Sequence, residues 1–184
     1  MNKVLLVIPE NSYKSNDFVI AAKKLELPFS IVTDSEQVSA DFTDNIFIVD
    51  FSKDITKDLL NKLSDITHVL PVDHSSLIFA SKLRDALKSV GNSQISVEAA
   101  MNKYTSRKVF NKITGIKINH EYVNSIDDIY KFMSNNSAAV LKPTKGTASN
   151  RVIKIEKDNV RNDYIENLIN NCSNDELVIE EFIQ

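Results

Sequence analysis

Up to residue 94 the chain alternates short apolar runs with segments of helical spacing, and this alternation limits the possible folds more than any other feature. Continuous apolar runs such as Lys3–Pro9 and Thr67–Val72 are typical of strands buried on both faces of a parallel sheet. Ser75–Val90 carries apolar residues at helical spacing, and we expect Gly91 to end that helix with a left-handed C-cap. Strands separated by helices predict parallel pairing with right-handed crossovers. Residues 1–94 are therefore predicted to form a Rossmann-like α/β domain. The other elements predicted here are helices at Asn16–Leu25 and Asp54–Leu63 and strands at Phe29–Thr33 and Asn45–Phe51.

From residue 95 onward the pattern becomes α+β, so we predict a second domain over residues 95–184. One helix is expected over Val97–Thr114 and would end at Gly115. Ser125 and Asp128 have the spacing of a capping box that opens a second helix.

The strands of this second part include a predicted hairpin. Ala138–Pro143 and Arg151–Glu156 are apolar runs joined by a polar loop, which favours antiparallel pairing. Leu177–Ile183 is expected to be a final strand. If it were unpaired, its free edge would favour association, so a homodimer is a possible partner arrangement.

Composition excludes some classes of function. The formal net charge is -3, which gives no basic excess to hold a nucleic acid. No run approaches the roughly 18 apolar residues that a membrane-spanning helix needs. Cys172 is the single cysteine and cannot form an internal disulfide, which suits a reducing cytoplasm.

The loop Lys142–Ser149 carries the clearest chemical signal. A lysine ends an apolar strand, and glycine, alanine and hydroxyl residues follow within a few positions. Small residues let backbone N–H groups approach an anion closely, and hydroxyls add donors. The loop is thus predicted to cover a phosphate, although a solvated hairpin tip would have the same composition.

Three ordered segments together resemble one known family. They are Asn102–Phe110, with a lysine and then an arginine at a helix start, the loop Val140–Ser149, and the strand end Glu180–Ile183. In this order and spacing they resemble the ATP-grasp superfamily, nearest to its carbamoyl-phosphate-synthase and biotin-carboxylase branch. The resemblance implies a Rossmann-like pre-ATP-grasp domain followed by the first subdomain of the ATP-grasp fold, with the chain ending before the second subdomain.

The resemblance also implies roles for individual residues. Lys103 and Lys142 would contact the phosphates of ATP, and the loop from Gly146 to Ser149 would cover them. Glu180 would accept from the adenine amino group, while the Glu181 carbonyl and the Ile183 N–H would read the adenine edge. Arg107 is interpreted as a helix-surface ion pair. The predicted cofactor-binding residues are Lys103, Lys142, Gly146, Thr147, Ala148, Ser149, Glu180, Glu181 and Ile183.

The implied activity is an ATP-dependent ligation. A small carboxylate or bicarbonate-like substrate would be activated by MgATP as an acyl phosphate, and an amine or ammonia would displace the phosphate. The Mg²⁺ ligands and the catalytic residues are expected after Gln184, so we expect no turnover by this chain alone.

Two alternatives stay open from the sequence. Asp50 ends an apolar strand, as does the phosphorylated aspartate of receiver domains, so a receiver-like or nucleotide-sensing binding module is possible. Ala148 and Arg151 stand where the family has glycines, so the chain could also be a scaffold whose ATP site has decayed.

Overall fold

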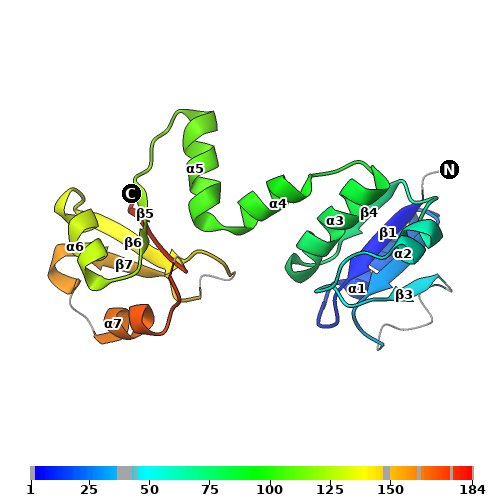
Figure 1. Cartoon of the computed structure of the whole chain (residues 1–184), viewed down its shortest axis with the longest axis horizontal. Coiled ribbons are helices and arrows are strands. Elements are labelled where there is room, and N and C mark those ends of the chain that lie inside the picture. Colours follow the sequence, from blue (N-terminus) through cyan, green and yellow to red (C-terminus); the bar gives the residue numbers. More distant parts are fainter. Residues whose placement is uncertain are drawn as a thin grey trace. The chain divides into compact units, whose positions relative to one another are not determined.

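The chain folds as two compact units, Met1–Glu98 and Ala99–Gln184 (Figure 1). The computed structural model describes residues 3–36, 43, 45–146, 150–160, 163–174 and 176–183. The division follows Glu98, whereas the sequence pattern places it after residue 94. Within the described ranges, no helix combines the length and apolarity needed to cross a bilayer.

The first unit contains a parallel sheet of four strands in the order β3-β2-β1-β4, which confirms the predicted α/β class. Alternate residues of β1 enter two different apolar clusters. Leu5 and Val7 pack with the α2 and α3 side, and Leu6 and Ile8 pack with Val19 of α1. Helices therefore cover both faces of the sheet, as the continuous apolar runs predict. The elements are β1 (Val4–Ile8), α1 (Ser15–Lys24), β2 (Phe29–Thr33), β3 (Ile46–Ile48), α2 (Lys57–Lys62), β4 (His68–Pro71), η1 (His74–Ser76) and α3 (Leu77–Leu87).

Two predictions at the end of this unit are wrong. The segment predicted as one helix over Ser75–Val90 begins as the 3-10 helix η1, and α3 ends earlier, where Lys88 adopts the left-handed conformation at φ 53°. Gly91 therefore does not cap the helix. It has φ +148°, and a Cβ built there would lie 2.5 Å from Cδ of Arg84. The glycine is needed because the Arg84 side chain fills the space beside it.

The strand order contradicts a receiver-like arrangement. In the order 2-1-3-4-5 of receivers, the third strand lies beside the first. Here β3 pairs with β2, so Asp50 follows an outer strand and is separated from β1 by β2. The order 3-2-1-4 matches the first four strands of a Rossmann fold.

The second unit has an antiparallel sheet in the order β5-β8-β6-β7. The predicted hairpin is confirmed as the β6–β7 pair. β8 pairs with β5 on one side and with β6 on the other, so the expectation of an unpaired final strand is wrong. Helix α4 (Gln94–Met101) crosses the division between the two units. The elements that follow it are α5 (Lys103–Thr114), β5 (His120–Val123), α6 (Ile126–Ser134), β6 (Ala138–Pro143), β7 (Ile153–Glu156), η2 (Lys157–Asn159), α7 (Asp163–Asn170) and β8 (Leu177–Glu181).

The helix predicted over Val97–Thr114 is two helices, α4 and α5. Asn102 between them is extended, at φ -110° and ψ 117°, and its side-chain oxygen accepts from the Thr105 N–H at 3.0 Å. Asparagine favours this N-cap position over a helix interior. Two predicted boundaries in this unit are confirmed. Gly115 ends α5 in the left-handed conformation, and Ser125 opens α6 through a capping box with Asp128.

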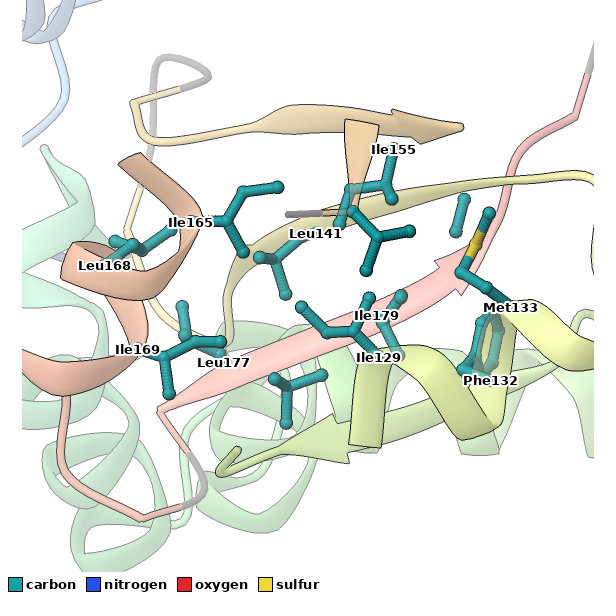
Figure 2. Close-up of a cluster of buried hydrophobic side chains, with 13 residues drawn as sticks. Ile129, Phe132, Met133, Leu141, Ile155, Ile165, Leu168, Ile169, Leu177 and Ile179 are labelled. Carbon is teal, nitrogen blue, oxygen red and sulfur yellow. The ribbon is translucent and has the colours of Figure 1, made fainter. Parts of the chain in front are cut away.

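The two faces of this sheet have different chemistry because side chains alternate along each strand. One face is apolar and packs against α6 and α7, whose side chains turn toward the strands in Figure 2. Burial of each such large aliphatic side chain contributes about 1.5–3 kcal/mol. The opposite face carries the polar residues that alternate with this core. Labelled core residues are Ile129, Phe132, Met133, Leu141, Ile155, Ile165, Leu168, Ile169, Leu177 and Ile179.

Candidate functional site

The polar face of the second sheet and the first turns of α5 enclose a small pocket. Its volume is about 180 Å³. Helix α5, the end of α4 and the strands β6 and β8 supply its walls. The lining residues are Ala100, Lys103, Ser106, Arg107, Phe110, Lys142 and Glu180.

Glu180 lies at the centre of the charged groups in this pocket. Its Oε2 accepts from Nε of Arg107 at 3.0 Å, and its Oε1 is 3.5 Å from Nη2 of the same guanidinium. Nζ of Lys142 donates to Oε1 as well. Glu180 is only 7% exposed. Two positive side chains thus contact one carboxylate, and Lys103 lines the same pocket, so the three cations and the single carboxylate leave a surplus of two positive charges.

Strand register and helix spacing explain why these residues meet. Val140 pairs with Glu180 and Lys142 pairs with Val178, so Lys142 and Glu180 are diagonal neighbours on the same face. Lys103 and Arg107 lie one turn apart on α5 and therefore project from the same side of the helix.

Lys103 also holds the start of the hairpin loop. Its main-chain N–H donates to the Thr144 carbonyl at 2.8 Å, and its Nζ donates to the Gly146 carbonyl at 2.9 Å. Thr144 is buried, and its own N–H donates to the Glu176 carbonyl at 2.7 Å. The loop thus leaves the sheet directly beside the cations. The predicted lid residues Thr147, Ala148 and Ser149 lie outside the described residues.

Burial changes the acid–base behaviour of both lysines. It lowers the pKa of Lys142 to about 8, and the nearby charges of Arg107 and Lys103 act in the same direction. Burial also lowers the pKa of Lys103. Lys142 therefore changes its charge within a few units of neutral pH.

The strand end beyond Glu180 has a different environment. The Glu181 N–H donates to the Asn119 carbonyl at 3.0 Å, and its side chain points to the opposite face from Glu180 because adjacent strand residues alternate. Ile183 follows β8 and is 61% exposed. Nζ of Lys154 lies 4.6 Å from the centre of the Phe182 ring.

Arg107 is the member of this cluster that the sequence predicts only as a helix-surface ion pair. Its ion pair with Glu180 connects α5 with β8, an inner strand of the sheet. Its spacing of one helical turn from Lys103 is the feature of the sequence that indicates a place in the same pocket. A cofactor with several negative charges fits the cluster. In the part of the chain that is described, no group of three or more His, Cys, Asp or Glu side chains could hold a metal ion.

Comparison with known proteins gives structural neighbours only. Neither a protein-family profile nor a curated protein matches the chain. The L-amino acid ligase of Bacillus licheniformis has a TM-score of 0.71 at 16% identity, over 100% of this chain and 44% of the ligase. An ADP complex of N5-carboxyaminoimidazole ribonucleotide synthetase has a TM-score of 0.70 at 14% identity, over 99% of this chain and 47% of the synthetase.

The D-alanine–D-alanine ligase of Bacillus anthracis adds a third neighbour, with a TM-score of 0.59 at 16% identity. The match covers 100% of this chain and 58% of that ligase. The chain has the fold of the N-terminal part of ATP-grasp ligases.

The ATP-grasp fold agrees with the order predicted from the sequence, in which a parallel α/β unit precedes a unit with an antiparallel sheet. The chain spans about half the length of the ATP-grasp proteins that it resembles. The assignment to a carbamoyl-phosphate-synthase or biotin-carboxylase branch stays a prediction.

Proposed function

We propose that the chain is the ATP-binding part of an ATP-grasp ligase that joins a carboxylate to an amine. The single observation that carries this proposal is the cluster around Glu180, where the side chains of Lys103, Arg107 and Lys142 line one pocket with one carboxylate. Desolvating several like charges is costly unless an anion offsets them. A polyphosphate supplies such an anion and accepts several charge-assisted hydrogen bonds.

In this proposal Lys103 and Lys142 contact the phosphates, and the loop that begins at Gly146 covers them. The Glu181 carbonyl and the Ile183 N–H read the adenine edge. Because both oxygens of Glu180 face cations, we assign this carboxylate to the cations in preference to the adenine amino group.

The size of the pocket supports a site that a further wall completes. Pockets for whole ligands of drug size enclose about 300–1,000 Å³. The pocket here encloses about 180 Å³, so a nucleotide bound through its phosphates would extend beyond it. The proposed second wall is the remainder of an ATP-grasp protein.

The proposed reaction has two steps. A carboxylate oxygen attacks the γ-phosphorus of ATP and ADP leaves, which gives an acyl phosphate. A neutral amine or ammonia then attacks the acyl carbon, loses a proton and releases phosphate. The residues described here would position the phosphates and offset their charge, which is the main requirement of phosphoryl transfer. We expect no turnover by the 184-residue chain itself.

Calorimetric titration with ATP tests the proposal. The wild-type chain is expected to bind ATP. Lys142→Gln is expected to bind it roughly 10–100-fold more weakly, since a hydrogen bond to a charged group contributes about 1.5–3 kcal/mol. Lys108→Gln removes the same charge from the exposed side of α5 and serves as the matched control. Equal ATP affinity in all three proteins would contradict the proposed site.

A further inference from the structure

We propose that Arg107 is a third anion-binding residue of the nucleotide site and that Glu180 positions Arg107 and Lys142 to receive the phosphates. This inference rests on the proposed function and assigns Arg107 and Glu180 roles that differ from those expected from the family resemblance. It concerns a ligand with several phosphate groups.

The contact between Arg107 and Glu180 leaves much of the guanidinium available. Glu180 faces Nε and Nη2, and a guanidinium has five N–H donors in a rigid fork. The Arg107 side chain is 27% exposed and lines the same pocket as Lys103 and Lys142. The remaining donors can therefore reach an anion in that pocket.

A purely structural ion pair would need one cation and one carboxylate. Here the Glu180 side chain is 9% exposed and contacts two cations, while Lys103 lies in the same pocket and donates to a carbonyl. The Glu180 carboxylate offsets one of the three positive charges and orients the side chains of Arg107 and Lys142. The surplus positive charge is left for a ligand.

The charged groups that face Lys142 predict opposite effects on its ionisation. From α5 these are Arg107 and Lys103, which disfavour a further positive charge, and from β8 it is Glu180, which favours one. Removing Arg107 therefore raises the pKa of Lys142, whereas removing the charge of Glu180 lowers it. These shifts follow from the charges around Lys142, and they change the pH dependence of binding only if Lys142 contacts the ligand.

The experiment titrates the 184-residue chain with ATP and with inorganic triphosphate over a range of pH. Arg107→Gln is expected to weaken binding of both probes at least about tenfold at pH 7. Lys108→Gln is the control and is expected to bind as the wild type does. The pH at which wild-type binding begins to weaken is expected to move upward in Arg107→Gln and downward in Glu180→Gln.

The outcomes separate this inference from the proposed function. Absence of ATP binding by the wild type would overturn both. If the wild type binds and Lys142→Gln weakens binding, but Arg107→Gln matches Lys108→Gln, only the role of Arg107 is overturned. Shifts in the same direction for Arg107→Gln and Glu180→Gln would overturn the positioning role of Glu180. If Arg107→Gln fails to fold, Arg107→Lys replaces it, and wild-type affinity for triphosphate in that variant would overturn the role of the fork.

Discussion

Lys103 holds Gly146 through a hydrogen bond of 2.9 Å between its Nζ and the Gly146 carbonyl oxygen. The main-chain N–H of the same lysine donates to the carbonyl of Thr144. One residue at the start of α5 thus fixes the start of the hairpin loop at two points. Lys103, which is proposed to contact the phosphates, is therefore also hydrogen-bonded to the loop that is proposed to cover them.

Replacing Lys103 with methionine tests this connection. The variant keeps most of the apolar side chain but loses Nζ, so the loop near Gly146 should open more often and its amide hydrogens should exchange faster. ATP binding should weaken as well, because a phosphate contact is lost. Hydrogen exchange by mass spectrometry measures the first effect, with Lys108→Met as control. Unchanged exchange at the loop start would show that the Nζ bond does not hold it.

Replacing Asn102 with alanine should destabilise the second unit. Its side chain caps α5 by accepting from the Thr105 N–H, and loss of such a cap costs about 1 kcal/mol, with a range of about 0.5–2. Urea denaturation measures the change in free energy of unfolding. Asn102→Asp retains the capping oxygen and should lie close to the wild type. If alanine and aspartate variants were equally stable, the cap would contribute nothing.

ATP affinity should depend on pH through Lys142. Below its pKa of about 8 the lysine is charged and can bind phosphate. As pH rises through 8 it loses its proton, so affinity should fall, well before the fall expected for an ordinary lysine at about 10.4. Calorimetry between pH 6.5 and 9.5 would follow this change. A flat profile up to pH 9.5 would be inconsistent with a phosphate contact from this lysine.

Gly91→Ala should destabilise the first unit. The backbone at Gly91 has φ +148°, and the added Cβ would lie 2.5 Å from Cδ of Arg84. We expect a loss of about 1–3 kcal/mol, which is typical of a side chain forced into a sparsely populated backbone conformation. In an Arg84→Ala background the steric part should disappear and the loss should be smaller. Thermal unfolding of the four proteins in this cycle gives the coupling, and a coupling of zero would exclude the predicted clash.

Local patterns in the sequence predict much of the fold. The strands β2 and β6 have the predicted bounds, because each is a short, largely apolar run next to residues that disrupt strands. The capping box at Ser125 and the left-handed glycine at Gly115 are also where their residue types predict them. In each case the determining interactions lie within a few residues of one another.

The misassigned features depend on contacts that are distant in sequence. Nothing local shows that β8 becomes an inner strand of its sheet, since its partners β5 and β6 precede it by many residues. The break between α4 and α5 was hidden because Asn102 stands within a continuous helical pattern. The Arg107–Glu180 pair spans 73 positions, so a helix-surface ion pair was the simpler interpretation of Arg107.

Hydrogen exchange with and without ATP tests the central claim most directly, namely that the hairpin loop and the end of β8 belong to one nucleotide site. The account predicts slower exchange in both Lys142–Gly146 and Glu180–Ile183 of the wild-type chain when ATP is added. It predicts little such protection in Lys142→Gln when ATP is added at a concentration close to the wild-type dissociation constant. Protection of only one segment, or of neither, would contradict a single site formed by both.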